Sequence, residues 1–371
     1  MQPVSYAAPT SGERAPRLHN FSAGPGALPT AVLDAARAEL PVYGDLGTSV
    51  LEISHRSPTY TEIAASARAR LRALLGLGDD WHILFLQGGA SMQFYQVPLN
   101  FLRADASADY LDTGTWSAKA IKEAKRCGGV KVVASSADSN YSYIPTPDTW
   151  TLDPSAAYLH YTSNNTIFGT QFADEPTADV PLVCDASSDF LSRPLDLDRY
   201  GLIYAGAQKN IGPAGVTVVL VQDAFLQTRK AALPTLLDFG THAAKLFHTP
   251  PVYAVYLVEK VLAWLQDHGG IDGIAEVNAR KATMLYGAID ATDFYTGTAR
   301  LDSRSQMNVC FRLPSEDLEA RFLTEAAEHG LLALKGHRSV GGIRASIYNA
   351  VEEASVEALV AFMRTFERNN G

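Results

Sequence analysis

Strand-like apolar segments alternate with helix-like segments over most of the chain, and this alternation limits the fold more than any other feature. Residues 215–221 are almost continuously apolar and β-branched, which is typical of a strand buried on both faces. Helices are predicted at 91–102 and 117–127, each after a strand. The other strands are predicted at 81–86, 108–112, 131–134, 157–160, 180–184 and 202–205. This order favours an α/β architecture with a mostly parallel sheet.

The pattern changes after about residue 265. A long helix is predicted around 276–288, and strands are predicted at 306–312 and 342–348. The last helix carries apolar residues along one face, and Ser355 is its expected N-cap. Strands and helices in this order indicate a smaller α+β unit that packs against the large one.

We therefore expect a large domain at 19–265, a small C-terminal α+β domain at 266–371 and a flexible tail at 1–18. The tail is polar and lacks the apolar core of a secretory signal. No stretch approaches the roughly 18 uninterrupted apolar residues of a membrane span. We expect no membrane partner.

Charge and cysteine content narrow the function classes further. The net charge is −9 and the basic residues are dispersed, so no nucleic-acid partner is expected. The three cysteines, Cys127, Cys184 and Cys310, are widely spaced and form neither a metal-binding spacing nor a disulfide framework. This favours a cytoplasmic protein without a metal site.

Lys209 is the first candidate for chemistry. It follows the predicted strand 202–205, lies between small residues and precedes a Gly/Pro-rich turn. Taken alone, it is more typical of an exposed turn lysine. Small neighbours, however, leave room for a bulky group, and burial among apolar strands favours the neutral amine that Schiff-base chemistry needs.

Asp185 follows the apolar strand 180–184 and therefore lies at the carboxyl edge of the predicted sheet, where α/β folds bind ligands. A turn or capping aspartate is an equally good reading of this residue alone. Together with Lys209, its carboxylate would keep a pyridinium nitrogen protonated, which makes the ring an electron sink.

Three weaker signals fit the same cofactor. Gly88 and Gly89 precede a predicted helix, whose N-terminal amides and Ser91 hydroxyl could hold a phosphate. Trp116 follows a strand and could stack on a ring, although an ordinary core indole is the commoner case. Thr166 lies in a polar loop and could bind a ring hydroxyl.

Four ordered motifs closely resemble phosphoserine aminotransferases, from about residue 19 to the C-terminus. They read NFSAGPG at 20–26, GTSVLEISHR at 47–56, YAGAQKNIGPAG at 204–215 and KGHRSVGGIRASIYN at 335–349. The resemblance implies a fold-type I, class V pyridoxal 5′-phosphate-dependent aminotransferase. It also implies a homodimer with active sites shared between the subunits.

The resemblance also assigns cofactor contacts. Lys209 carries the cofactor as a Schiff base, Asp185 pairs with the pyridine nitrogen and Trp116 stacks on the ring, which makes these three the catalytic residues. Thr166 and Gln208 match further contacts, and Ala90 and Ser91 occupy the phosphate cradle. His248 and Thr249 match a phosphate-binding pair that the neighbouring subunit contributes.

The substrate residues follow a charge logic, because phosphoserine carries both a carboxylate and a phosphate. Arg344 matches the family's carboxylate-binding arginine. His337 and Arg338 resemble its phosphate contacts, joined by His55 and Arg56 from the other subunit. On an acidic chain, these residues form a local gathering of cations.

Three positions depart from the pattern of many members of this family. Ser91 stands where many have arginine in the cradle, Ala23 replaces a serine, and His248 replaces asparagine. Imidazole can still donate a hydrogen bond, and its charge would partly offset the missing arginine.

The expected reaction converts 3-phosphohydroxypyruvate and glutamate reversibly to O-phospho-L-serine and 2-oxoglutarate, a step of serine biosynthesis. Family members also make 4-phosphohydroxy-L-threonine in pyridoxine biosynthesis. Two alternatives stay open within class V, a small-amino-acid aminotransferase and a cysteine desulfurase-like lyase, of which the second needs a low-pKa cysteine. A non-enzymatic nucleotide-binding module would leave Lys209 unexplained and lacks a glycine-rich nucleotide motif.

Overall fold

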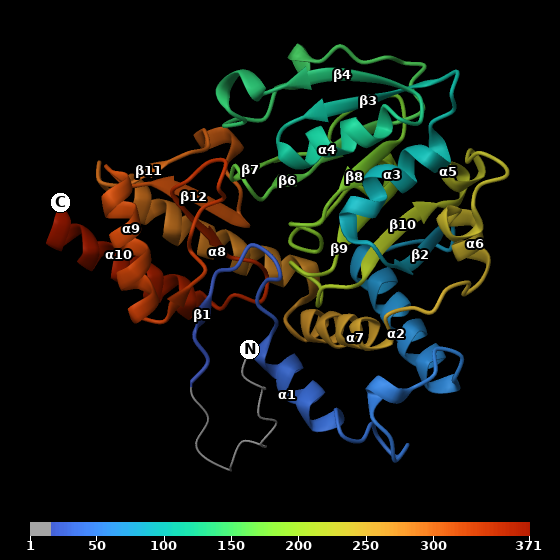
Figure 1. Ribbon diagram of the computed structural model, residues 1–371, viewed down its shortest axis with the longest axis horizontal. Helices are drawn as coiled ribbons and strands as arrows, with labels where there is room; N and C mark the ends of the chain where they lie inside the picture. Colours follow the sequence, from blue (N-terminus) through green and yellow to red (C-terminus); the bar gives the residue numbers. More distant parts are fainter. Residues whose placement is uncertain (1–15) are drawn as a thin grey trace, which may run out of the picture.

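The computed structural model describes residues 16–371; residues 1–15 of the predicted tail lie outside this range. A central sheet of seven strands has the order β2-β10-β9-β8-β5-β3-β4, and β10 is antiparallel to both of its neighbours while the other pairs are parallel. The mostly parallel α/β fold is therefore confirmed (Figure 1). The strands are β2 (Trp81–Leu86), β3 (Ser107–Asp112), β4 (Gly129–Ser135), β5 (Leu159–Thr162), β8 (Leu182–Asp185), β9 (Tyr200–Gly206) and β10 (Thr217–Gln222).

Helices cover both faces of this sheet, which explains the continuous apolar runs of its strands. On one face, Val219 packs with α3 (Gly89–Phe101) and α4 (Thr115–Ala124). On the other face, Val218 packs with α2 (Pro58–Leu75) and α7 (Val252–Asp267). The remaining helices of this part are α1 (Thr30–Glu39), α5 (Asp223–Gln227) and α6 (Phe239–Ala244).

The C-terminal part forms a second core beside the sheet (Figure 1, orange to red). Its antiparallel sheet has the order β11-β12-β14. Its elements are α8 (Gly270–Asp290), β11 (Thr296–Gly297), β12 (Asn308–Arg312), α9 (Glu316–Glu328), β13 (Leu331–Leu332), β14 (Ile343–Ser346) and α10 (Glu353–Asn370). Two short strands, β6 (Asn164–Asn165) and β7 (Thr170–Gln171), pair with each other beyond the end of β5.

The beginning of the described chain packs with its end. β1 (His19–Asn20) pairs in parallel with β13, and Phe21 is fully buried in the C-terminal core. The helix α8 contributes Ile271 to the core of the large sheet and Leu285 to the C-terminal core. The division at residue 265 stays a prediction, and these contacts describe how the two cores are joined.

The expected cap of the last helix is wrong. The N-cap of α10 is Glu352, which makes no side-chain capping bond. Ser355 lies within the first turn, where its hydroxyl lies 2.9 Å from Nδ1 of His19. The serine thus joins the helix to β1 instead of capping it.

Lys281 on α8 is fully buried and has no acidic partner within salt-bridge distance in the described residues. Its ammonium donates to the carbonyls of Ile347, Tyr348 and Val351 at 2.9, 2.8 and 3.0 Å. These carbonyls follow β14 and precede α10, outside the pairing of strands, and the Tyr348 carbonyl also accepts the Val351 amide at 2.9 Å. Burial lowers the pKa of Lys281 to about 7.

Replacing Lys281 by methionine is expected to destabilise the protein by about 3 kcal/mol, because buried carbonyls lose their donors. Thermal unfolding of the cofactor-loaded protein measures the loss. Lys122→Met removes an exposed lysine on α4 and serves as the control. Equal melting temperatures for both variants would contradict this role.

Candidate active site

Residues far apart in the sequence meet at one edge of the large sheet. The strands β2, β3, β5, β8 and β9 run in the same direction, and the loops at their carboxyl ends lie at this edge. Asp185 ends β8, and Lys209 follows β9 by three residues. The edge therefore gathers the predicted cofactor residues, as expected of a parallel α/β sheet.

A cavity of about 130 Å³ lies at this edge. Six predicted site residues line it together: Ala90, Ser91, Trp116, Asp185, Gln208 and Lys209. The other lining residues are Gly89, Phe94, Thr162, Asn164, Ser187 and Ser188. The cavity thus joins the beginning of α3, Asp185 and Lys209 in a single space.

Lys209 extends from a loop that the N-terminal segment holds in place. The Gly26 amide donates to the Gln208 carbonyl at 2.7 Å, and a Cβ atom on Gly26 would lie 3.0 Å from the Lys209 carbonyl. The Lys209 ammonium nitrogen donates to Oγ1 of Thr166 at 2.7 Å. Burial lowers the pKa of Lys209 to about 8, and Arg344 acts in the same direction, while Asp185 opposes the shift.

This lowered pKa predicts how the cofactor-free protein captures pyridoxal phosphate. The neutral amine is the reactive form, so the capture rate should rise about ten-fold between pH 7 and pH 9 and level off above. Stopped-flow absorbance measures the rate. Because the Asp185 charge raises the lysine pKa, Asp185→Asn should move the profile to lower pH, and an unmoved profile would contradict the coupling.

Asp185 is buried at the end of β8, and its Oδ1 accepts the Ser187 amide at 3.0 Å. Burial raises the pKa of this carboxyl, while the bonds from Ser187 and the charge of Lys209 oppose the rise. Thr162 is its register partner on β5. The hydroxyl of Thr162 is buried, has no hydrogen-bond partner among residues 16–371 and lines the same cavity, so it can bond to a ligand there.

The opposite end of the cavity suits a phosphate. Gly88 and Gly89 have φ values of +89° and +63° and form the start of α3. The first amides of a helix have no carbonyl acceptor within the helix, so they can bind an anion. A Cβ atom on Gly89 would meet nothing within 4 Å. Ala90 and Ser91 belong to this first turn. The donors present thus fit an anion in the same cavity as Asp185.

Trp116 lines the cavity, whereas Arg344 and Thr166 are not among its lining residues and are connected to it through Lys209. The Lys209 nitrogen lies 5.7 Å from the centre of the Trp116 ring. Arg344, on β14, donates to the Thr166 carbonyl at 3.3 Å. Thr166 therefore contacts both the lysine, through its hydroxyl, and the arginine, through its backbone.

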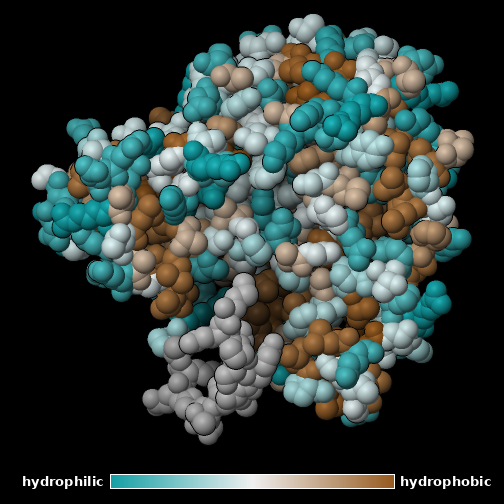
Figure 2. All heavy atoms as spheres, viewed as in Figure 1, coloured by the Kyte–Doolittle hydropathy of each residue, from teal (hydrophilic) through white to brown (hydrophobic). Residues whose placement is uncertain are grey.

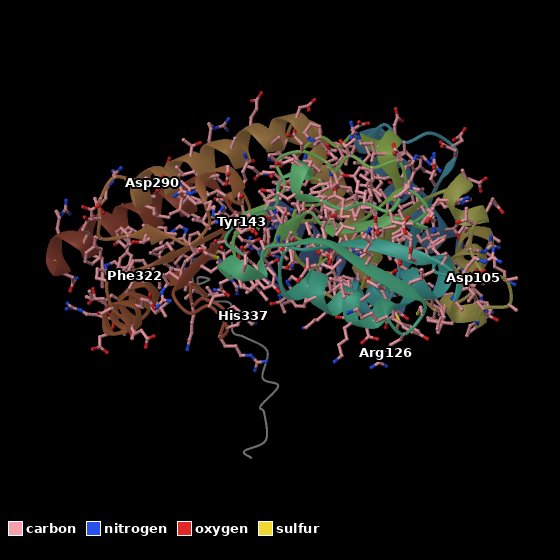
Figure 3. The ribbon with its side chains drawn as sticks, turned by 90° about the horizontal axis from the view of Figure 1, so that it is seen from above. Asp105, Arg126, Tyr143, Asp290, Phe322 and His337 are labelled. Carbon is pink, nitrogen blue, oxygen red and sulfur yellow. The ribbon has the colours of Figure 1, made fainter. Side chains whose placement is uncertain are left out.

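His337 and Arg338 lie on the loop between β13 and β14, and Figure 3 shows His337 where the C-terminal part meets the large sheet. Burial lowers the pKa of His337, and the positive charges of Arg344, Arg338 and Lys119 add to the effect. Lys119 was not predicted; its nitrogen lies 4.5 Å from the Trp116 ring centre. Lys119 thus lies beside Trp116, which lines the cavity, and its charge acts on His337 together with those of Arg344 and Arg338.

His55, Arg56, His248 and Thr249 do not line this cavity. His248 instead lines a second cavity of about 370 Å³ beside α2 and α6, and neither of its ring nitrogens has a hydrogen-bond partner in the described part of the chain. Burial lowers the pKa of His248, and the nearby His242 and His55 add to the shift. The Thr249 carbonyl accepts from Gln87 at 3.2 Å. Whether a partner subunit uses these four residues stays a prediction.

The three cysteines are unsuited to a reactive thiolate. Burial raises the pKa of Cys127, Cys184 and Cys310, the last to about 12. None of the three lines the cavity of Lys209. This disfavours the lyase alternative, which requires a low-pKa cysteine.

Two kinds of site residue escaped prediction. Thr162 could have been found from its place at the end of an apolar strand, by the reasoning that found Asp185. Asn164, Ser187 and Ser188 lie in loops whose polar residues carry no distinctive spacing.

Comparison with known proteins identifies the family of the chain. Residues 18–359 match the aminotransferase class-V family. A phosphoserine aminotransferase of Desulfosudis oleivorans is 54% identical over 96% of this chain and 99% of its own length. One of Pseudomonas aeruginosa is 52% identical, with the same coverage. The crystal structure of phosphoserine aminotransferase from Bacillus circulans subsp. alkalophilus matches with a TM-score of 0.93 at 50% identity, over 96% of this chain and 99% of that one.

These matches show that the chain belongs to the class-V aminotransferases. Within that class it belongs to the family of the phosphoserine aminotransferases, which it matches over nearly its whole length. The predicted family, fold and enzyme class are confirmed.

Proposed function

We propose that this enzyme transfers an amino group reversibly between glutamate and 3-phosphohydroxypyruvate, giving 2-oxoglutarate and O-phospho-L-serine. Pyridoxal phosphate is its cofactor. The observation that carries the proposal is the single cavity joining Lys209, Asp185 and the first turn of α3, with Arg344 beside it. The family members that it matches are named for the same reaction.

The residues that line the cavity, together with Thr166 beside Lys209, would each contact one part of the cofactor. The amides at the beginning of α3, with Ala90 and Ser91, would hold its phosphate, and Asp185 would pair with the ring nitrogen. Trp116 would stack on the ring, and Thr166 and Gln208 would add polar contacts. When bound, pyridoxal phosphate supplies an aldehyde that condenses with amines and a ring that stabilises negative charge at the substrate α-carbon.

The chain's own catalytic work falls mainly to Lys209. Its lowered pKa increases the fraction of neutral amine near neutral pH, so the amine can take a proton from the substrate α-carbon and would return it to the cofactor carbon that carried the aldehyde. The Thr166 hydroxyl, 2.7 Å away, holds the amine in place. Asp185 is buried and hydrogen-bonded, so water does not weaken its effect on the ring.

Substrate binding follows from charge. The Arg344 guanidinium would take the substrate carboxylate as a fork, and His337 and Arg338 would take the phosphate. Dianionic phosphate at His337 would favour the charged imidazole and offset the lowering of its pKa by burial and the neighbouring cations. A substrate with two separated anionic groups fits this arrangement.

A homodimer with shared sites completes the proposal. Large exposed apolar side chains gather on α1, the segment after it and the segment around α6: Leu33, Val42, Leu46, Leu51, Leu236, Leu246 and Phe247. Figure 2 shows brown side chains over the part of the surface formed by α1 and its neighbours. Burial of these residues against a second copy would bring His55, Arg56, His248 and Thr249 to the partner's site. Light scattering of the purified protein tests the dimer.

A half-reaction tests the function. Adding phosphoserine to the cofactor-loaded enzyme, without a keto acid, should convert the visible absorption of the bound cofactor to that of its amine form. Unphosphorylated serine is the control and should react far more slowly. A response to small neutral amino acids but not to phosphoserine would refute the proposal and favour a small-amino-acid aminotransferase.

The same assay with 4-phosphohydroxy-L-threonine tests the second activity, in pyridoxine biosynthesis.

In described residues 16–371, no helix is long and apolar enough to cross a membrane. The three unpaired cysteines support a reducing cytoplasm, where serine biosynthesis would take place.

A further inference from the structure

The loop between β13 and β14 carries His337 and Arg338 and turns back on itself. The Gly336 amide donates to the Gly342 carbonyl at 2.8 Å, and the His337 carbonyl accepts from Val340 and Gly341 at 2.9 and 2.8 Å. His337 also bonds within the loop, to Ser339 at 2.7 Å. The loop is thus ordered internally, and its position depends on what holds it from outside.

Arg312, the last residue of β12, supplies such a contact. Its Nη1 donates to the Val340 carbonyl at 3.2 Å. Among the side-chain hydrogen bonds of the described residues, this one joins residues 336–342 to a side chain outside the loop. Val340 is two residues from Arg338, so the bond acts close to the predicted phosphate contacts.

A buried carboxylate on α9 holds the Arg312 guanidinium in place. The arginine Nε donates to Oε1 of Glu319 on α9, whose side chain is only 8% exposed. Glu319 Oε1 also accepts the Leu313 amide at 3.4 Å. A carboxylate this buried needs its cationic partner, so Glu319 restricts the guanidinium to one position.

Two glycines bring the loop backbone against this arginine. Gly341 and Gly342 have φ values of +75° and +67°, which disfavour larger residues. A Cβ atom on Gly342 would lie 2.6 Å from Cδ of Arg312 and 2.7 Å from the Phe311 carbonyl. The arginine stem therefore packs directly on the turn that leads into β14 and Arg344.

We propose that Arg312 is a positioning residue that sets the affinity of the site for the substrate phosphate, by holding the loop of His337 and Arg338 against β12. The inference rests on the proposed function, which assigns the phosphate to this loop. Glu319 is the second member of the device, because it fixes the arginine.

The test compares two amino donors in the half-reaction of the cofactor-loaded enzyme. Phosphoserine needs the loop, whereas L-alanine offers only the carboxylate that Arg344 would bind. In Arg312→Met, half-saturation for phosphoserine should require about ten-fold more substrate, because a displaced binding group loses its geometry. The maximal rate with phosphoserine and the apparent second-order rate constant with alanine should stay within about two-fold.

Three further variants sharpen the result. Arg321→Met removes the same charge from α9, where Arg321 pairs with Glu325 on the surface, and should behave as wild type. Arg312→Lys keeps a cation and a donor and should recover most of the affinity. The pair Arg312→Met and Glu319→Gln avoids a buried unpaired carboxylate, so it keeps the test valid if the single variant folds poorly.

A ten-fold loss confined to phosphoserine, restored by lysine, would support the role. Unchanged half-saturation, or an equal loss with alanine, would overturn it, because a general structural defect does not distinguish the two donors. If wild type itself ignores phosphoserine, the proposed function fails, and this inference fails with it.

Discussion

Replacing Lys209 by alanine is expected to abolish turnover and to remove the visible absorption band of the lysine-bound cofactor. Among the described residues that line the cavity, Lys209 alone has an amine that can both bond covalently to the cofactor and move a proton there. Loss of a nucleophile with this double role typically lowers turnover by about 10⁶-fold. Absorption spectra of the purified variant and steady-state assays measure the two effects.

Lys125→Ala, which removes an exposed lysine at the end of α4, is the control and should retain both activity and absorption. Added methylamine should partly restore proton transfer in Lys209→Ala if the amine acts as the base. Substantial turnover of Lys209→Ala without any added amine would refute the assignment of Lys209.

The second large effect is expected for Asp185→Asn. Asparagine keeps the shape of the side chain and can still accept the Ser187 amide, but it carries no charge to hold a pyridinium proton. Loss of this preorganised charge should lower turnover by about 10³-fold. Steady-state assays at saturating cofactor separate this loss from weaker cofactor binding.

Asp189 offers a matched control, because it is also a buried carboxylate near the end of β8. It bonds to Ser163 and Gln171 and does not line the cavity. Asp189→Asn should therefore cost far less turnover than Asp185→Asn. Equal losses in both variants would indicate that burial of any carboxylate here matters, and not its contact with the ring.

The sequence allowed the large sheet to be predicted because both faces of its strands are covered. The run at 215–221 is apolar throughout, since Val218 and Val219 pack on opposite faces. Lys209 and Asp185 could be predicted for the same reason, because polar residues directly after buried strands lie at the binding edge.

Features that depend on contacts between distant segments could not be predicted in this way. The sequence around Phe21 does not indicate that its side chain packs in the C-terminal core. The bond between Arg312 and Val340 joins two parts of the chain through a backbone carbonyl. Every residue has such a carbonyl, so the sequence does not indicate which one an arginine contacts. Serine commonly caps the N-terminus of a helix, but Ser355 lies within the first turn of α10 and contacts His19 instead.

The contacts of Thr166 link substrate binding at Arg344 to proton transfer by Lys209. Thr166 contacts the Lys209 amine through its hydroxyl and Arg344 through its carbonyl, so the two cationic groups lie close enough for Arg344 to lower the pKa of Lys209. A substrate carboxylate that binds Arg344 would neutralise this charge and relieve its repulsion of a proton on the lysine. Arrival of the substrate would thus strengthen the base when a proton has to be moved, whereas in the empty site the charge of Arg344 increases the fraction of neutral amine.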